Sequence, residues 1–157
     1  MTAADPGRGH QGRKLARRTA LQALYQWQLT GQAPADIERQ FREEQDLDRV
    51  DLDYFRELLY RVPEAAAELD AALTPLLDRP LAQVDPVERA ILRIGAFELT
   101  HRPEIPYRVV LNEAIELARV FGAEQGHRFV NAALDRLSRT LRPHEAPGPQ
   151  AEREPAA

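Results

Sequence analysis

The apolar residues of this chain recur every three or four positions, and no stretch alternates apolar and polar residues with a period of two. β-branched residues, which favour strands, are sparse. A chain with this pattern buries one side of each of several helices against the others. We therefore predict an all-α fold, a compact helical bundle without a sheet.

Caps and helix breakers indicate where the helices begin and end. Asp85 is the clearest N-cap, because a proline follows it and Glu88 stands where the third residue of a capping box belongs. Gly31 is expected to end the first helix, and Gly122 to end the fifth in a left-handed conformation. Pro63 should kink or split the third helix. The expected helices cover residues 12–29, a segment from 34, residues 51–77, a segment from 85, residues 106–122 and residues 124–141.

The helices expected from residue 85 and over 106–122 are apolar around more than half of their circumference. We expect both at the centre of the bundle, since such helices need neighbours on most sides.

The chain ends have a different composition from the helical region. Residues 1–11 are small and polar, and residues 143–157 hold four of the twelve prolines. We predict a disordered basic arm at 1–11, a helical domain at 12–142 and a disordered Pro/Ala/Glu-rich tail at 143–157.

Composition excludes several classes of protein. The chain has no cysteine, which excludes disulfides and thiol chemistry, and no metal site is expected. No apolar run approaches the roughly 20 residues of a membrane span, and the start of the sequence lacks the apolar segment of a signal peptide. No glycine-rich phosphate loop, HExxH motif or nucleophile elbow is found. We expect a cytoplasmic protein that is not an enzyme and uses no cofactor.

The charge of −4 is unevenly distributed along the chain. Residues 1–18 carry five basic residues against one acidic residue, whereas residues 36–57 carry nine acidic residues against four arginines. A locally basic end on an acidic chain is typical of a polyanion-binding site, and the acidic stretch is typical of a solvated or repelling face.

The first helix places basic, amide and aromatic side chains on one side. Successive spacings of four, four and three residues bring these side chains together: Lys14, Arg18, Gln22 and Tyr25. Arg13 and Arg17 lie nearer the boundary with the apolar side. Guanidinium groups bind phosphate and a tyrosine ring can stack on an unpaired base, which favours a single-stranded RNA site. The alternative interpretation is a solvated arginine-rich helix end beside a half-buried core tyrosine.

A second cluster lies at the start of the last helix. Arg128 points away from the apolar stripe of that helix and Phe129 lies at the edge of the stripe. This pair supplies a phosphate contact and a stacking surface. The alternative is that Phe129 belongs to the core and Arg128 is only solvated.

Five segments in one collinear order resemble the NusB family: ALYQWQL at 23–29, YFRELL at 54–59, VERAILRIGAFEL at 87–99, IPYRVVLNEAIELARVFGAE at 105–124 and HRFVNAALD at 127–135. The resemblance covers residues 12–142 and implies a NusB-like all-helical RNA-binding domain, a compact bundle of six to seven helices in two small subdomains. It also implies transcription antitermination through single-stranded boxA RNA of ribosomal RNA operon leaders. The implied partners are NusE, a small-subunit ribosomal protein, and the RNA polymerase antitermination complex.

Matching by motif implies nine RNA-facing residues: Arg13, Lys14, Arg17, Arg18, Gln22, Tyr25, Glu88, Arg128 and Phe129. Glu88 has two interpretations, as a capping-box residue that needs no RNA or as an acceptor for base amino groups. The sequence departs from the family pattern at Leu15, within the basic run, and at Gln125 and Gly126, which follow FGAE in the expected first turn of the last helix.

Two further hypotheses remain open. The chain could be a helical interaction protein whose main state is a homodimer, with RNA binding secondary. It could also derive from the NusB-like domain of ribosomal-RNA methyltransferases, although 157 residues leave no room for the methyltransferase domain.

Overall fold

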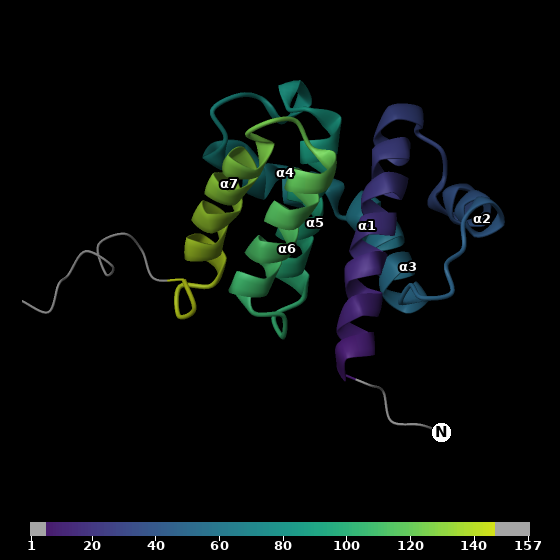
Figure 1. The fold of residues 1–157 in the computed structure, drawn as a ribbon. Helices are drawn as coiled ribbons and strands as arrows, with labels where there is room; N and C mark the ends of the chain where they lie inside the picture. The colour runs from purple at the N-terminus through teal and green to yellow at the C-terminus, as the bar shows by residue number, and fades with distance from the viewer. Residues whose placement is uncertain (1–5, 147–157) are drawn as a thin grey trace, which may run out of the picture. The chain divides into compact units, whose positions relative to one another are not determined.

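The computed structural model describes residues 6–146, with side chains from residue 9 onward (Figure 1). Within that range it contains seven α-helices, two short 3-10 helices and no strand, which confirms the all-α prediction. The elements are, in chain order, α1 (Pro6–Thr30), α2 (Pro34–Glu44), α3 (Leu52–Glu64), α4 (Ala66–Leu73), η1 (Thr74–Leu76), η2 (Leu81–Gln83), α5 (Pro86–His101), α6 (Tyr107–Phe121) and α7 (Gly126–Leu141).

The chain divides into two compact units, Met1–Ala66 and Ala67–Ala157, in agreement with the two expected subdomains. In the first unit, α1 packs against α2 and α3, which also contact each other. In the second unit, α5, α6 and α7 pack against one another, and η1 contacts α7.

The core of the first unit is built on the small residues of α1. Ala16, Ala20 and Ala23 are fully buried, and their short side chains let α1 lie close to the apolar side of α3. Phe55 and Leu58 of α3 are also fully buried. This face of α1 is therefore its core face.

The first helix begins at Pro6 and not near Gly12. Residues 6–11, which the sequence suggested were part of a disordered arm, are helical, and residues 1–5 lie outside the described residues. The carbonyl of Gly12 accepts a hydrogen bond from the backbone N–H of Asp51 at 3.0 Å. A Cβ at Gly12 would lie 3.4 Å from the carbonyl oxygen of Arg49. This is an ordinary van der Waals distance, so Gly12 lies within α1 against the loop before α3 and does not mark a helix start.

The long third segment is split, as predicted from its proline. The carboxylate of Asp51 accepts from the backbone N–H of Tyr54 and so caps the start of α3. Pro63 lies in the last turn of α3, and Ala65 separates α3 from α4. Because a proline removes a backbone donor and crowds the preceding turn, the helix ends directly after it.

The second unit has α5 at its centre, as expected. Ten of its sixteen residues are buried, including Ile91, Leu92 and Phe97. The expectation that α6 is equally central is wrong. Only one side of α6 is buried, while Arg108 and Val120 are exposed, the latter by 52%. Apolar residues are numerous on α6, but the neighbours α5 and α7 cover one side of it.

The turns between helices differ partly from the expectation. Gly31 is left-handed with φ of 70°, which confirms it as the terminator of α1. Gly122 has extended backbone (φ −86°, ψ 175°), so its prediction as a left-handed residue is wrong. Glycine is needed there because a Cβ would lie 2.7 Å from the carbonyl oxygen of Ala118. The left-handed residue of this turn is Gln125, with φ of 70°.

The start of the predicted tail is ordered in residues 143–146, and residues 147–157 lie outside the described residues. Ala146 is buried, and a carboxylate oxygen of Glu145 accepts from the backbone N–H of Tyr107 at 3.1 Å. Arg142 holds this segment against the end of α5. Its buried guanidinium donates to four backbone carbonyls, those of Glu98, Leu99, Arg102 and Ile105. It also bonds Glu145 at 2.9 Å. Hydrogen bonding to the carbonyl end of α5 therefore holds residues that composition alone suggests are disordered.

Candidate nucleic-acid interface

The polar side of α1 is continuous over three turns in the first unit. Arg18 and Gln22 are exposed, Tyr25 is 38% exposed and Lys14 is half-buried. The amide oxygen of Gln22 lies 3.5 Å from the amide nitrogen of Gln45 on the chain following α2. The structure therefore brings together on one helix face the four residues that the sequence grouped there.

Arg13 and Arg17 have a different environment from the other basic residues of α1. Their guanidinium carbons lie 4.3 Å and 5.5 Å from the ring centroid of Tyr54, and Arg17 is only 2% exposed. Tyr54 is itself buried against α1. Two stacked cations on one ring fix the direction of both arginine side chains. Tyr54 was not among the predicted site residues, because nothing in the sequence indicates that this ring lies beneath the arginines of another helix.

In the second unit, Arg128 and Phe129 lie in the first turn of α7. Arg128 is exposed and Phe129 is half-buried, so neither simple alternative from the sequence describes the pair fully. The guanidinium of Arg79 lies over the Phe129 ring, 4.6 Å from its centroid. Arg79 also donates to the carboxylate of Asp78 from Nε at 2.9 Å and from Nη2 at 3.4 Å. Arg79 was missed because it stands in a loop fifty positions before the ring that it covers.

Glu88 is buried, with 6% of its surface exposed, and lies under the turn between α6 and α7. Asp85 caps α5 as predicted, accepting from the backbone N–H groups of Val87 and Glu88. The Glu88 carboxylate, however, accepts from the backbone N–H of Ala123, and a Cβ on Gly126 would collide with it. The capping-box interpretation of its side chain is therefore wrong: Glu88 supports the α6–α7 turn.

The environment of Glu88 disfavours its charged form. Burial raises the pKa of this carboxyl above its ordinary value, and the nearby charge of Asp85 raises the pKa further. The hydrogen bond from Ala123 and the charge of Arg79 act in the opposite direction and are smaller influences.

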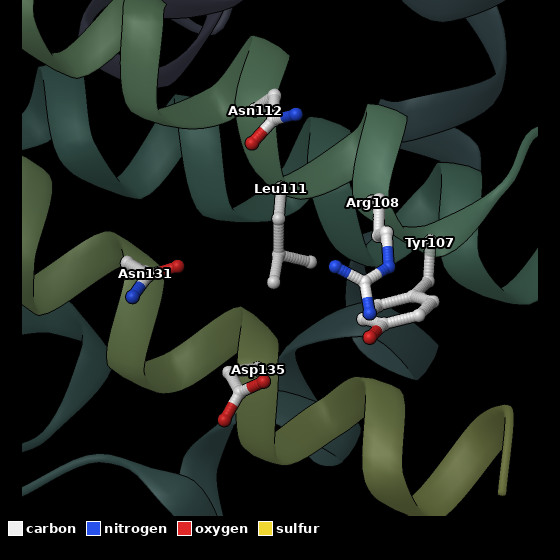
Figure 2. A pocket seen from close by; sticks show the side chains of 6 residues that line it. All are labelled: Tyr107, Arg108, Leu111, Asn112, Asn131 and Asp135. Carbon is white, nitrogen blue, oxygen red and sulfur yellow. The ribbon is translucent and has the colours of Figure 1, made fainter. Parts of the chain in front are cut away.

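A shallow polar groove of about 220 Å³ lies between α6 and α7 (Figure 2). It is lined by Tyr107, Arg108, Leu111, Asn112, Asn131 and Asp135. Figure 2 shows the Arg108 guanidinium beside the Tyr107 ring on one side of the groove, and Asn131 and Asp135 on α7 across from it. Asp135 is paired with Arg139 at 3.1 Å. No sequence pattern pointed to this groove, which contains none of the nine predicted site residues.

Among the described residues there is no group of three or more histidine, aspartate or glutamate side chains arranged to hold a metal ion. Of the helices in residues 6–146, none combines the length and apolar character needed to cross a membrane.

Comparison with known proteins gives a single family. A profile described as the NusB family matches residues 14–139. The transcription antitermination protein NusB of Nitrosococcus oceani is 60% identical over 133 residues, covering 85% of this chain and 89% of that protein. The protein of the same name from Shewanella amazonensis is 58% identical over 125 residues, covering 80% and 93%. The solved structure of T. maritima NusB is 28% identical, with a TM-score of 0.63, and covers 85% of this chain and 95% of that one.

Proposed function

The chain belongs to the NusB family of transcription antitermination proteins, and from this premise we propose that it binds single-stranded boxA RNA of ribosomal RNA operon leaders together with NusE. In this proposal it acts in the cytoplasm as part of the RNA polymerase antitermination complex. It contributes RNA binding and no catalysis.

The observation that carries the proposal is the polar face of α1. Arg18 and Gln22 are exposed, and Tyr25 follows them on the same face. Arginine supplies a planar cation for phosphate, and an exposed ring supplies a stacking surface for an unpaired base. These are the two components of single-strand recognition. A merely solvated helix end does not require the ring.

Arg13 and Arg17 enter the proposal in a second role. Their contacts with the Tyr54 ring hold the N-terminal end of the polar face in place. A phosphate can still approach Arg13, which is half-buried, whereas Arg17 is buried and is assigned a positioning role.

The second unit contributes its own surface to the proposal. Arg128 offers an exposed cation near the N-terminus of α7, where backbone N–H groups favour an anion. Phe129 places an aromatic ring in the same first turn of α7, and Glu88 supports the α6–α7 turn that precedes both residues. Both surfaces are proposed RNA contacts.

NusE is proposed to raise the affinity for RNA. The net charge of −4 and the few exposed cations on the two proposed surfaces allow only modest binding by this chain alone. A basic ribosomal protein bound beside the RNA would add phosphate contacts, and the two ligands would then favour each other's binding.

The test is a titration of labelled boxA RNA with the full chain, with and without NusE, using a scrambled RNA of equal length as control. We expect preference for boxA and a gain in affinity with NusE. Equal binding to both RNAs would exclude sequence-specific recognition, and an unchanged affinity with NusE would exclude the proposed heterodimer. Size-exclusion chromatography of the same samples separates this function from the homodimer hypothesis, in which the chain stays dimeric when RNA is added.

A further inference from the structure

Arg79 occupies an unusual place in the second unit. Its guanidinium lies over the ring of Phe129, and its side chain is 45% exposed. The two hydrogen bonds to Asp78 leave from Nε and Nη2, which are on the edge of the guanidinium plane. Because guanidinium N–H groups point within that plane, these bonds leave the faces of the group unblocked. The guanidinium carbon lies over the Phe129 ring, 4.6 Å from its centroid, and the exposed fraction shows that the side chain is open to solvent.

We propose that Arg79 is an RNA-binding residue whose guanidinium forms a stacking platform, with Phe129 beneath it and an unpaired base on its outer face. This inference rests on the proposed RNA-binding function and assigns a residue and a contact that the sequence did not indicate. Guanidinium planes are established stacking surfaces for unpaired bases.

Three neighbours hold the platform. Phe129 supports the guanidinium from one side through a cation–π contact. Asp78 fixes its rotation through two edge bonds. The charge of Glu88 also acts on Arg79, since it raises the pKa of the guanidinium slightly after the larger influence of Asp78. A preoriented group loses less freedom when a base stacks on it, which favours binding.

The competing explanation is that Arg79 covers Phe129 and must leave before a base can stack on the ring. A base could displace Arg79 from the ring, because a stacked base contributes more to affinity than the contact that is lost. The stacked base contributes about 5- to 150-fold and an exposed cation–π contact about two- to fivefold. The two explanations differ in what removal of Arg79 does. Loss of a platform weakens RNA binding, whereas loss of a cover strengthens it.

Arg79→Lys is the decisive variant, since lysine keeps the charge and removes the plane. The groove provides a matched control in Arg108, an exposed arginine 5.5 Å from the ring centroid of Tyr107 in the same unit. Labelled boxA RNA is titrated against the full chain, Arg79→Lys, Arg79→Ala, Arg108→Lys and Arg108→Ala at several salt concentrations. Thermal melts confirm that each variant is folded.

We expect Arg79→Lys to bind RNA about fivefold more weakly, the lower end for loss of a stacked base, with an unchanged salt slope. Arg79→Ala should weaken binding at least as much, and both Arg108 variants should bind like the parent. Parent-like affinity in Arg79→Lys would show that only the charge matters and would overturn the platform. Tighter binding by Arg79→Ala would overturn it in favour of a cover. If the unaltered chain fails to bind boxA both alone and with NusE, the proposed function itself fails, and that result is distinct from both.

Discussion

At the residue scale, the ring of Tyr25 distinguishes the two interpretations of α1. It is 38% exposed on the face that carries Arg18 and Gln22. Tyr25→Leu keeps most of the apolar volume and removes the aromatic surface. We expect this variant to lose about 1–3 kcal/mol of RNA-binding free energy, with an unchanged salt slope, because stacking carries no net charge. RNA titration measures the loss. Parent-like affinity in Tyr25→Leu would identify Tyr25 as a packing residue only.

Glu88 is the residue whose protonation should affect folding. Its pKa is raised in the folded chain, mainly by burial, so the charged form is disfavoured relative to the unfolded chain. The cost is present above the raised pKa and disappears as the pH falls below the ordinary value of 4.5. Glu88→Gln keeps an acceptor for the N–H of Ala123 and removes the charge. We expect it to melt at a higher temperature than the parent at pH 7, with the difference vanishing near pH 4. A difference that persists at pH 4 would point to a cause other than ionisation.

At the element scale, the start of α7 combines a strained residue with a proposed anion site. Gln125 is the N-cap residue, left-handed, exposed and without a side-chain cap, whereas the sequence had suggested that it lies within the first turn. Aspartate and asparagine tolerate this conformation better than glutamine. An aspartate there also gains about 0.3–1 kcal/mol from the helix dipole. We expect Gln125→Asp and Gln125→Asn both to raise the melting temperature.

The two variants should differ in RNA binding. The added carboxylate of Gln125→Asp repels phosphate near Arg128, most strongly at low salt, while Gln125→Asn adds no charge. Titrations at two salt concentrations compare them with the parent. Should Gln125→Asp bind RNA as tightly as Gln125→Asn at low salt, the start of α7 is not near phosphate.

Arg142 links the end of α5 to the turn that follows it. Its buried guanidinium bonds four carbonyls around the end of α5 and the following turn. Arg142→Ala leaves these acceptors without their partner, and we expect a loss of about 3 kcal/mol or more in the free energy of unfolding. Arg142→Lys should recover only part of it, because an ammonium cannot reach the same set of acceptors. Denaturant unfolding gives the values. If Arg142→Ala loses less than about 1 kcal/mol in the free energy of unfolding, water must replace the hydrogen bonds of the guanidinium.

Local chemistry explains which elements could be predicted from the sequence. Asp85 and the following proline fixed the start of α5, and Gly31 fixed the end of α1, since each acts on its own backbone. The starts of α1 and α7 were misjudged because distant contacts decide them. Gly12 faces the loop before α3, and the turn before α7 lies over Glu88. The polar face of α1 followed from helical spacing. Only tertiary folding brings Tyr54 to Arg13 and Arg17, and Arg79 to Phe129.

At the scale of the whole molecule, a chain with a net charge of −4 must bind a polyanion through a few local cations. With about four phosphate contacts, the logarithm of the affinity should fall against the logarithm of the salt concentration with a slope near −3. Arg18→Gln removes one exposed cation and should flatten this slope by about 0.7. Arg17→Gln should change the slope less and lower the melting temperature more, because Arg17 is buried on Tyr54.

The salt dependence of RNA affinity also tests how NusE contributes to binding. If NusE adds phosphate contacts of its own, the slope for boxA should become steeper when NusE is present, by about 0.7 for each added contact. A gain in affinity without a change in slope would mean that NusE acts by ordering the RNA or this chain and not through its charge. The Arg18→Gln variant provides the internal control, because its deficit in slope should persist in the presence of NusE. If NusE abolishes that deficit, the RNA leaves the polar face of α1 in the ternary complex, and the proposed role of this face is wrong.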